Sequence, residues 1–227
     1  MKKLGVKLFL AAQLVTSMSF ANDCGWSGLS DKEKADIAGG QIIQKADFSQ
    51  GLEDYTIDAY SFTKSSSLKS SAAAYYDAAT TQNGELQIVD TVTLADGQKA
   101  SNNPVIYQVI PSPKNPLGPL YQPFSYELSV HPEGDAYVFN VNWLTSPVLV
   151  KTAQSLVCLV KVNGTVLMRL KTSFAGNPMV GFDKVNPETR VFIWKTVAAG
   201  TAMRASKPAT KLQKQNLVKA LLGNFRD

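Results

Sequence analysis

Few side chains in the 227-residue sequence have the type and spacing that catalysis requires. The candidates are four ionisable residues in or beside expected strands, namely Asp90, Glu127, His131 and Arg169. An enzyme could use such a group as a positioned acid or base. No Ser-His-Asp, Cys-His or paired-carboxylate spacing accompanies them, and charged strand residues usually face solvent. We therefore expect no catalytic residue, although an enzymatic function stays open as an alternative.

The two cysteines, Cys24 and Cys158, allow two interpretations. In an oxidising compartment, a disulfide between them would close a long loop and stabilise the fold by roughly 4–5 kcal/mol. Alternatively, Cys158 is a buried free thiol that behaves as a small hydrophobe. His131 is the only histidine, so no cluster of His and Cys predicts a metal site. We expect neither a metal nor a cofactor.

The first 21 residues have the pattern of an export signal. Lys2 and Lys3 precede an apolar segment at residues 8–15, and Ser19-Phe20-Ala21 fits the small-x-small cleavage rule. We expect residues 1–21 to be a signal peptide and residues 22–227 to form a single domain, exported to the periplasm or secreted. Nothing after the signal is apolar enough to span a bilayer.

The charge of the chain argues against nucleic acid as a partner. The sequence carries 23 basic and 18 acidic residues, a formal net charge of +5. Loss of the signal removes three lysines, and no dense basic patch is interleaved with aromatic residues. The basic residues near the C-terminus form a solvated face or attract anionic lipid headgroups in transient membrane-surface contact; they are Arg204, Lys207, Lys211, Lys214, Lys219 and Arg226. Nothing in the sequence specifies an oligomeric state.

The elements that must position any site follow from periodicity and turn signals. Ser30 and Glu33 form a capping box that begins a helix. Residues 41–45 and 55–63 are expected strands, and helical spacing from Leu68 predicts a second helix. Six further strands are expected at 86–94, 104–110, 123–131, 136–145, 153–162 and 165–174.

Hairpin turns join most of these strands into an antiparallel sheet. Asn163-Gly164 between two alternating segments is the strongest signal, because a type I′ turn needs positive φ at both central residues. The segment from Pro111 to Pro123 cannot pair as a central strand and should be a loop or a sheet-edge excursion. Alternation places Phe139 and Trp143 on one apolar face of their strand.

Two helices complete the chain. Asn186 caps the first, and Pro187 occupies its first position, where the missing N–H costs nothing. We expect its sheet-facing stripe to contain Thr189, Phe192, Ile193, Thr196, Val197, Gly200 and Met203. Gly200 costs about 1 kcal/mol relative to Ala, which indicates close backbone approach, room for a ligand, or chance tolerance. After Lys207-Pro208 a shorter amphipathic helix follows.

This order of elements resembles the START-like superfamily, also called the polyketide cyclase (SRPBCC) or Bet v 1-like helix-grip superfamily, and an exported bacterial member of it. The resemblance covers roughly residues 29–205. It rests on the short helix before Gly40-Gln41-Ile42-Ile43, the helix containing Tyr75-Tyr76-Asp77, Asn142-Trp143, and the long C-terminal helix. It implies an α+β fold in which a curved, seven-stranded antiparallel sheet wraps around that helix. It also implies an apolar pocket for lipids, sterols, polyketides or other hydrophobic molecules.

Three functions are consistent with these features. The first is binding or carriage of a hydrophobic small molecule or lipid in an internal cavity, without catalysis. The alternatives are a cyclase- or hydrolase-like enzyme and a structural or interaction protein with a filled core. If the cavity is open, we expect its lining to include apolar-face positions of the strands and helix, namely Tyr107, Tyr126, Phe139, Trp143, Met168, Ile193, Val197 and Gly200.

Overall fold

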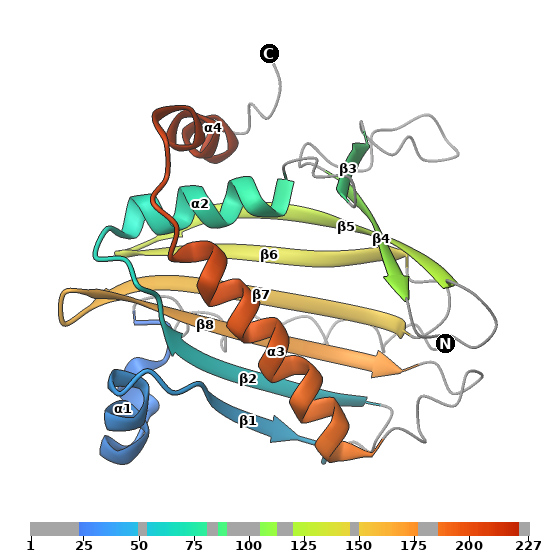
Figure 1. The fold of residues 1–227 in the computed structure, drawn as a ribbon, viewed down its shortest axis with the longest axis horizontal. Helices are drawn as coiled ribbons and strands as arrows, with labels where there is room; N and C mark the ends of the chain where they lie inside the picture. Colours follow the sequence, from blue (N-terminus) through green and yellow to red (C-terminus); the bar gives the residue numbers. More distant parts are fainter. Residues whose placement is uncertain are drawn as a thin grey trace, which may run out of the picture.

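The computed structural model describes residues 23–49, 54–80, 86–89, 105–112, 120–145, 150–176 and 186–222. Eight strands form one antiparallel sheet in the order β1-β2-β8-β7-β6-β5-β4-β3 (Figure 1). This is one strand more than the resemblance implies. The strands are β1 (Ile43–Asp47), β2 (Asp54–Phe62), β3 (Leu86–Val89), β4 (Val105–Ser112), β5 (Leu120–Glu133), β6 (Ala136–Thr145), β7 (Val150–Val162) and β8 (Thr165–Gly176).

Two helices cover one face of this sheet, which we call the inner face. The long helix α3 (Pro187–Ala205) crosses it diagonally, and α2 (Leu68–Thr80) lies over β5 and β6 (Figure 1). Helix α4 (Lys211–Leu221) packs on α2. The N-terminal segment, with η1 (Trp26–Gly28) and α1 (Asp31–Ala38), packs on the opposite, outer face and at the β1–β2 edge. No helix in the described ranges is long and apolar enough to cross a membrane.

The predicted caps and hairpin are confirmed. Ser30 and Glu33 make both bonds of the capping box, and the Asn186 side chain accepts the backbone N–H of Thr189 at the start of α3. In the β7–β8 hairpin, Asn163 and Gly164 have φ of 49° and 84°, as a type I′ turn requires. These features are decided by neighbouring residues, which is why the sequence pattern predicts them well.

The proline-rich segment differs in part from its prediction. Pro111 and Pro123 lie inside strands β4 and β5, where Pro111 pairs with Tyr121 and Val109 pairs with Pro123. In the described residues, β3 pairs with β4 only up to Gln108, and β6 pairs with β5 only from Ser125. Within the described residues, each proline therefore lies where its strand pairs with one neighbour, which is the position in a sheet where proline is tolerated. At these two positions the segment is therefore part of the sheet and not a loop. Residues 113–119 lie outside the described part of the structure.

The predicted sheet-facing stripe of α3 is wrong. Phe192 and Met203 are 70% and 63% exposed. The side buried toward the sheet contains Arg190, Trp194, Ala198, Thr201, Ala202 and Ala205. Alanines let the helix backbone approach the sheet closely, and the buried Trp194 indole N–H donates to the Tyr55 hydroxyl at 3.0 Å. The choice of side therefore follows packing and hydrogen bonding, and not the largest apolar residues.

The two sheet faces have separate cores. The inner core joins α2, α3 and α4 to residues such as Ala59, Phe139 and Met168. The outer core groups Cys24, Leu29, Ile37 and Tyr60 with the alternate residues of β6, β7 and β8. Strand alternation therefore assigns side chains to faces as the sequence predicts.

Candidate functional site

A cleft of about 380 Å³ lies between the inner face of the sheet and the helices α2 and α3. We call it the α2–α3 cleft. The sheet contributes its floor, α2 contributes Tyr75 and Ala79, and α3 contributes one side. Its lining residues are Tyr75, Ala79, Tyr126, Val141, Ser155, Val157, Leu170, Trp194, Thr196, Val197, Gly200, Thr201 and Arg204. This volume falls at the lower end of ligand pockets, which span about 300–1,000 Å³.

The floor of the cleft is apolar, and the hydroxyl groups of Ser155 and Thr201 in the lining have hydrogen-bond partners within the protein. Val141, Val157 and Leu170 belong to neighbouring strands. The Ser155 hydroxyl lies 3.0 Å from that of Thr172, and Thr201 donates to the Val197 carbonyl. Such internal bonding leaves few unsatisfied polar atoms, so the floor suits the apolar part of a ligand.

The helix side of the cleft is open at Gly200. A Cβ added there would meet no heavy atom within 4 Å apart from its chain neighbours and the adjacent backbone of its own helix. Its neighbours along the helix, Thr196, Val197 and Arg204, line the cleft and are also exposed. The cleft therefore opens to solvent along α3, and the glycine widens it at this point.

One end of the cleft carries two tyrosine hydroxyls and a guanidinium group. Tyr126 donates to the Ala79 carbonyl at 3.1 Å, and Tyr75 packs edge-on against Phe139 with ring centroids 4.8 Å apart. Burial raises the pKa of Tyr75 to about 12, although the positive charge of Arg204 opposes that rise. Burial likewise raises the pKa of Tyr126, with Tyr75 adding to the rise and Arg204 opposing it. Both phenols therefore stay neutral at physiological pH.

The structure places three of the eight expected cavity residues in the lining: Tyr126, Val197 and Gly200. Phe139 and Met168 are fully buried in the inner core and are absent from the lining. Both share the inner face with the cleft, but other side chains pack over them. The side chains of Tyr107, Trp143 and Ile193 lie outside the described part of the structure.

Sequence reasoning missed the contributions of α2 and the end of α3. Tyr75 and Ala79 are one helical turn apart, and their spacing predicted a buried face without indicating that it bordered a cleft. Arg204 follows Val197 and Gly200 at helical spacing. That spacing could have identified it, but it was grouped with the other basic residues of the C-terminal segment.

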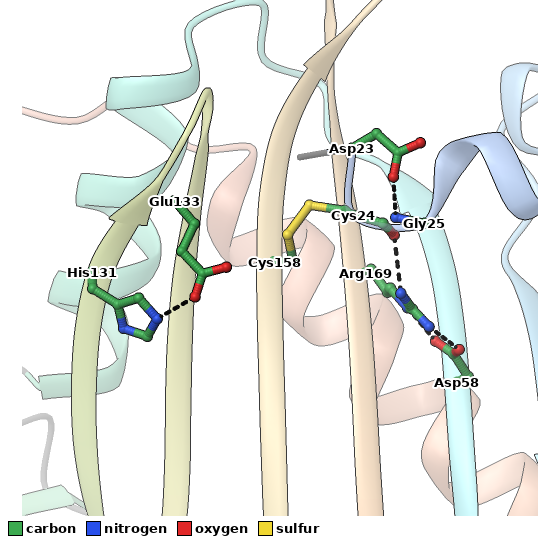
Figure 2. Close-up of a disulfide and its surroundings, with 8 residues drawn as sticks. All are labelled: Asp23, Cys24, Gly25, Asp58, His131, Glu133, Cys158 and Arg169. Carbon is green, nitrogen blue, oxygen red and sulfur yellow. Dashed lines mark hydrogen bonds and ion pairs between the residues drawn. A yellow bond between two sulfur atoms is a disulfide. The ribbon is translucent and has the colours of Figure 1, made fainter. Parts of the chain in front are cut away.

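The described catalytic candidates lie away from the cleft. Strand alternation places Glu127, His131 and Arg169 on the outer face, and Asp90 lies outside the described residues. His131 Nε2 lies 2.7 Å from Glu133 Oε1, two residues further along β5 (Figure 2). No group of three or more His, Cys, Asp and Glu in the described ranges could hold a metal ion.

Arg169 is buried and not solvent-facing as charged strand residues usually are. Its Nε and Nη2 donate to both carboxylate oxygens of Asp58, at 2.8 and 2.6 Å, and Nη1 donates to the Cys24 carbonyl at 3.4 Å (Figure 2). Gly25 lies so close that an added Cβ would be 2.6 Å from Nη1. Arg169 therefore ties the N-terminal segment to β2 and β8.

Cys24 and Cys158 form a disulfide beside this ion pair (Figure 2), which decides between the two interpretations of the cysteines. Their Cα atoms are 5.7 Å apart, although 134 positions separate them in sequence. Cys24 and Cys158 are both completely buried. The covalent link anchors the N-terminal segment to the central strand β7.

Comparison with known proteins gives matches in structure alone. No protein-family model matches the chain, and no curated protein matches it by sequence. Human STARD10 matches with a TM-score of 0.50 and 11% identity, over 87% of this chain and 89% of that one. The Zhui aromatase/cyclase from Streptomyces sp. R1128 gives a TM-score of 0.39 at 8% identity, over 79% and 98% of the two chains.

The di-domain ARO/CYC StfQ from the steffimycin biosynthetic pathway has a TM-score of 0.42 and 11% identity. The match covers 78% of this chain and 52% of StfQ, so the chain spans about half the length of that protein. The likeness to STARD10 extends over most of both chains and concerns the fold. Together with the sheet order and the long C-terminal helix, it shows that the chain has an α+β, START-like helix-grip fold.

Proposed function

We propose that this chain binds and carries a hydrophobic small molecule or lipid in the α2–α3 cleft, without catalysis. The observation that carries the proposal is the cleft itself, with its apolar floor and the open space at Gly200. Burial of apolar ligand surface contributes roughly 25 cal/mol per Å². Among the described residues that line the cleft, none is a carboxylate, histidine or cysteine, so the lining favours binding over acid–base chemistry.

Filling the cleft from α3 tests this proposal. Gly200→Leu should lower the affinity for a fluorescent lipid at least fivefold, because the new side chain occupies ligand space. Stability should be kept, because leucine favours a helix more than glycine does, by nearly 1 kcal/mol. Ala199→Leu is the matched control, since Ala199 is exposed on the same helix and does not line the cleft.

The outcomes separate a carrier from a protein with a filled core. Weaker binding by Gly200→Leu, with Ala199→Leu equal to the parent, supports the proposal. Unchanged affinity together with a lower melting temperature would indicate overpacking, which typically costs ~1–3 kcal/mol, and would reject ligand binding at this position. Mass spectrometry of lipids extracted from natively purified protein supplies an independent check.

We also propose that the chain is exported and that the mature protein begins at Asn22. The basic and apolar pattern of residues 1–21 supports this proposal. The Cys24–Cys158 disulfide adds to it, because disulfides persist in oxidising compartments such as the periplasm. N-terminal sequencing of the mature protein should start at Asn22, and finding Met1 instead would reject export with cleavage.

Transient contact with an anionic membrane surface is a further part of the proposal. Leu212 of α4 and Leu222, the C-cap residue of this helix, are 65% and 70% exposed, and they accompany the exposed Lys211. Lysine attracts anionic lipid, while exposed leucines can enter the headgroup region. Co-flotation with phosphatidylserine vesicles but not phosphatidylcholine vesicles is expected, and Leu212→Ser should weaken it. Equal flotation with both vesicles, or with neither, would contradict this contact.

A further inference from the structure

The lining of the α2–α3 cleft is charged at one end and mostly apolar elsewhere, and this asymmetry indicates a more specific class of ligand. Arg204 is the one charged side chain among the described residues that line it. It has no ion pair in the described part of the chain, unlike the buried Arg169 with its Asp58 partner. A cation at the end of an otherwise apolar cleft suits a ligand with an apolar body and an acidic end.

The position of Arg204 on α3 places its charge near the open part of the cleft. Side chains on a helix lean toward its N-terminus, so Arg204 extends back over the preceding turn. That turn contains Gly200, four residues earlier, which has no side chain to fill the space. The guanidinium and the open space are therefore neighbours, as their shared place in the lining also shows.

Two phenol groups lie at the same end. Tyr75 lines the cleft, and its hydroxyl has no hydrogen-bond partner within the described ranges. The Tyr126 hydroxyl donates to the Ala79 carbonyl at 3.1 Å, so its proton is already used within the protein. All three groups line the same cleft, and the charge of Arg204 opposes the rise in the pKa of both phenols. Tyr75 can donate to an acid oxygen while Arg204 pairs with its charge.

We propose that the cleft binds a single-chain anionic amphiphile, with its carboxylate or phosphate at Arg204 and Tyr75 and its apolar chain along Val141, Val157 and Leu170. This inference rests on the proposed carrier function and names its ligand class. The modest cleft volume, about 380 Å³, favours one chain over two. Arginine pairs bidentately with carboxylates and phosphates alike, so the headgroup is defined by its negative charge.

The test compares ligands that share one chain and differ in the headgroup. Dodecanoic acid, dodecyl phosphate, dodecanol and dodecyltrimethylammonium are used to displace a neutral fluorescent lipid from the parent protein. We expect at least one anion to bind about tenfold more tightly than dodecanol, as a hydrogen-bonded charge pair would provide. The cation should bind most weakly, and salt should reduce the preference because the guanidinium is exposed. The preferred anion identifies the headgroup.

Three variants assign the preference to the proposed residues. Arg204→Gln should remove the preference for the anion and leave dodecanol affinity unchanged. Tyr75→Phe keeps the ring against Phe139 and should lower anion affinity a few-fold. Lys195→Gln is the control, because it removes a cation from an exposed position of α3 that does not line the cleft.

Each result decides a different claim. Equal binding of dodecanol and both anions by the parent, or an anion preference that survives in Arg204→Gln, would overturn the anionic-ligand inference while leaving a carrier intact. Failure of all four compounds to displace the probe, or failure of the probe to bind, would reject the carrier function itself. The salt dependence is measured on the parent alone, so the inference stays testable even if a variant folds poorly.

Discussion

The two faces of the sheet hold their side chains in different ways. On the outer face, three contacts hold the N-terminal segment on the sheet. They are the disulfide of Cys24, the close packing of Gly25 against Arg169, and the bond from Arg169, itself paired bidentately with Asp58, to the Cys24 carbonyl. On the inner face, α2 and α3 pack through small and aromatic residues and leave a cleft between them. A polar cluster specifies one geometry because buried charges must keep their partners. Apolar packing imposes no such pairing, and it can leave room for a ligand.

This contrast suggests that the two faces have different roles. The outer face stabilises the central strands, while the inner face contains the cleft for a ligand. If the division holds, changes on the outer face should alter stability without altering ligand affinity. Changes around the cleft, such as Gly200→Leu and Arg204→Gln, should alter ligand affinity without lowering stability.

Removing the disulfide should have the largest effect on stability. Cys24→Ser combined with Cys158→Ser is expected to lower the free energy of unfolding by about 4–5 kcal/mol, because the bridge closes a loop of 134 positions in the unfolded chain. Denaturant unfolding measures the loss. Fluorescent-lipid affinity should stay unchanged under conditions where the variant is folded. A clear drop in that affinity would show that the two faces are coupled.

Breaking the outer ion pair should have the next largest effect. Asp58→Asn leaves the guanidinium of Arg169 without its charged partner in a mostly buried position, which should cost about 3 kcal/mol. The control is Lys45→Gln, which breaks the 2.8 Å surface pair with Glu33 and should cost less than 1 kcal/mol. Thermal unfolding of both variants gives the comparison. Equal losses would show that burial does not distinguish the two pairs.

Alkaline pH should destabilise the inner face through Tyr75. Burial raises the pKa of Tyr75 from 10.0 to about 12. The unfolded chain ionises first, so this contribution to stability is complete below pH 10 and is lost as the pH rises toward 12. The loss should reach about 2–3 kcal/mol by the usual conversion of a pKa shift.

Tyrosinate absorbance and denaturant unfolding at several pH values measure this effect. Tyr75→Phe should unfold with a weaker dependence on pH in the same window, and its reduced dependence serves as the control. An identical dependence in the parent and the variant would show that Tyr75 is not the group responsible.

The effect of acid on Glu33 of α1, at the edge of the sheet, should be the smallest of these effects. The hydrogen bond from Lys45 is the largest cause that lowers the pKa of Glu33 from 4.5 to about 2, and bonds from Ser30 add to it. The stabilisation is therefore present above pH 4.5 and is lost as the pH falls toward 2. Amide hydrogen exchange in residues 31–38 should accelerate over that window, more than in Glu33→Gln. Equal acceleration across the inner-face strands would contradict a local effect.

The comparison of faces also shows which parts of the site could be predicted from sequence. Tyr126, Val197 and Gly200 were expected at the cavity and line the cleft. Phe139 and Met168 were expected there on the same grounds, but they are covered by other core residues. Core packing and cavity lining produce the same apolar pattern along a strand. The difference depends on what packs above each residue, which the strand itself does not encode.

Sequence alone determined the local structure of this chain: the caps of α1 and α3, the Asn163-Gly164 turn, and the alternation that assigns strand residues to faces. Each depends on interactions between residues a few positions apart. The tertiary structure decided the side of α3 that meets the sheet, the partner of Arg169, and the place of Arg204 in the cleft. These depend on contacts between distant elements. Small residues on α3 pack closely against the sheet. The free energy gained from this packing outweighs the cost of exposing larger apolar residues such as Phe192 and Met203.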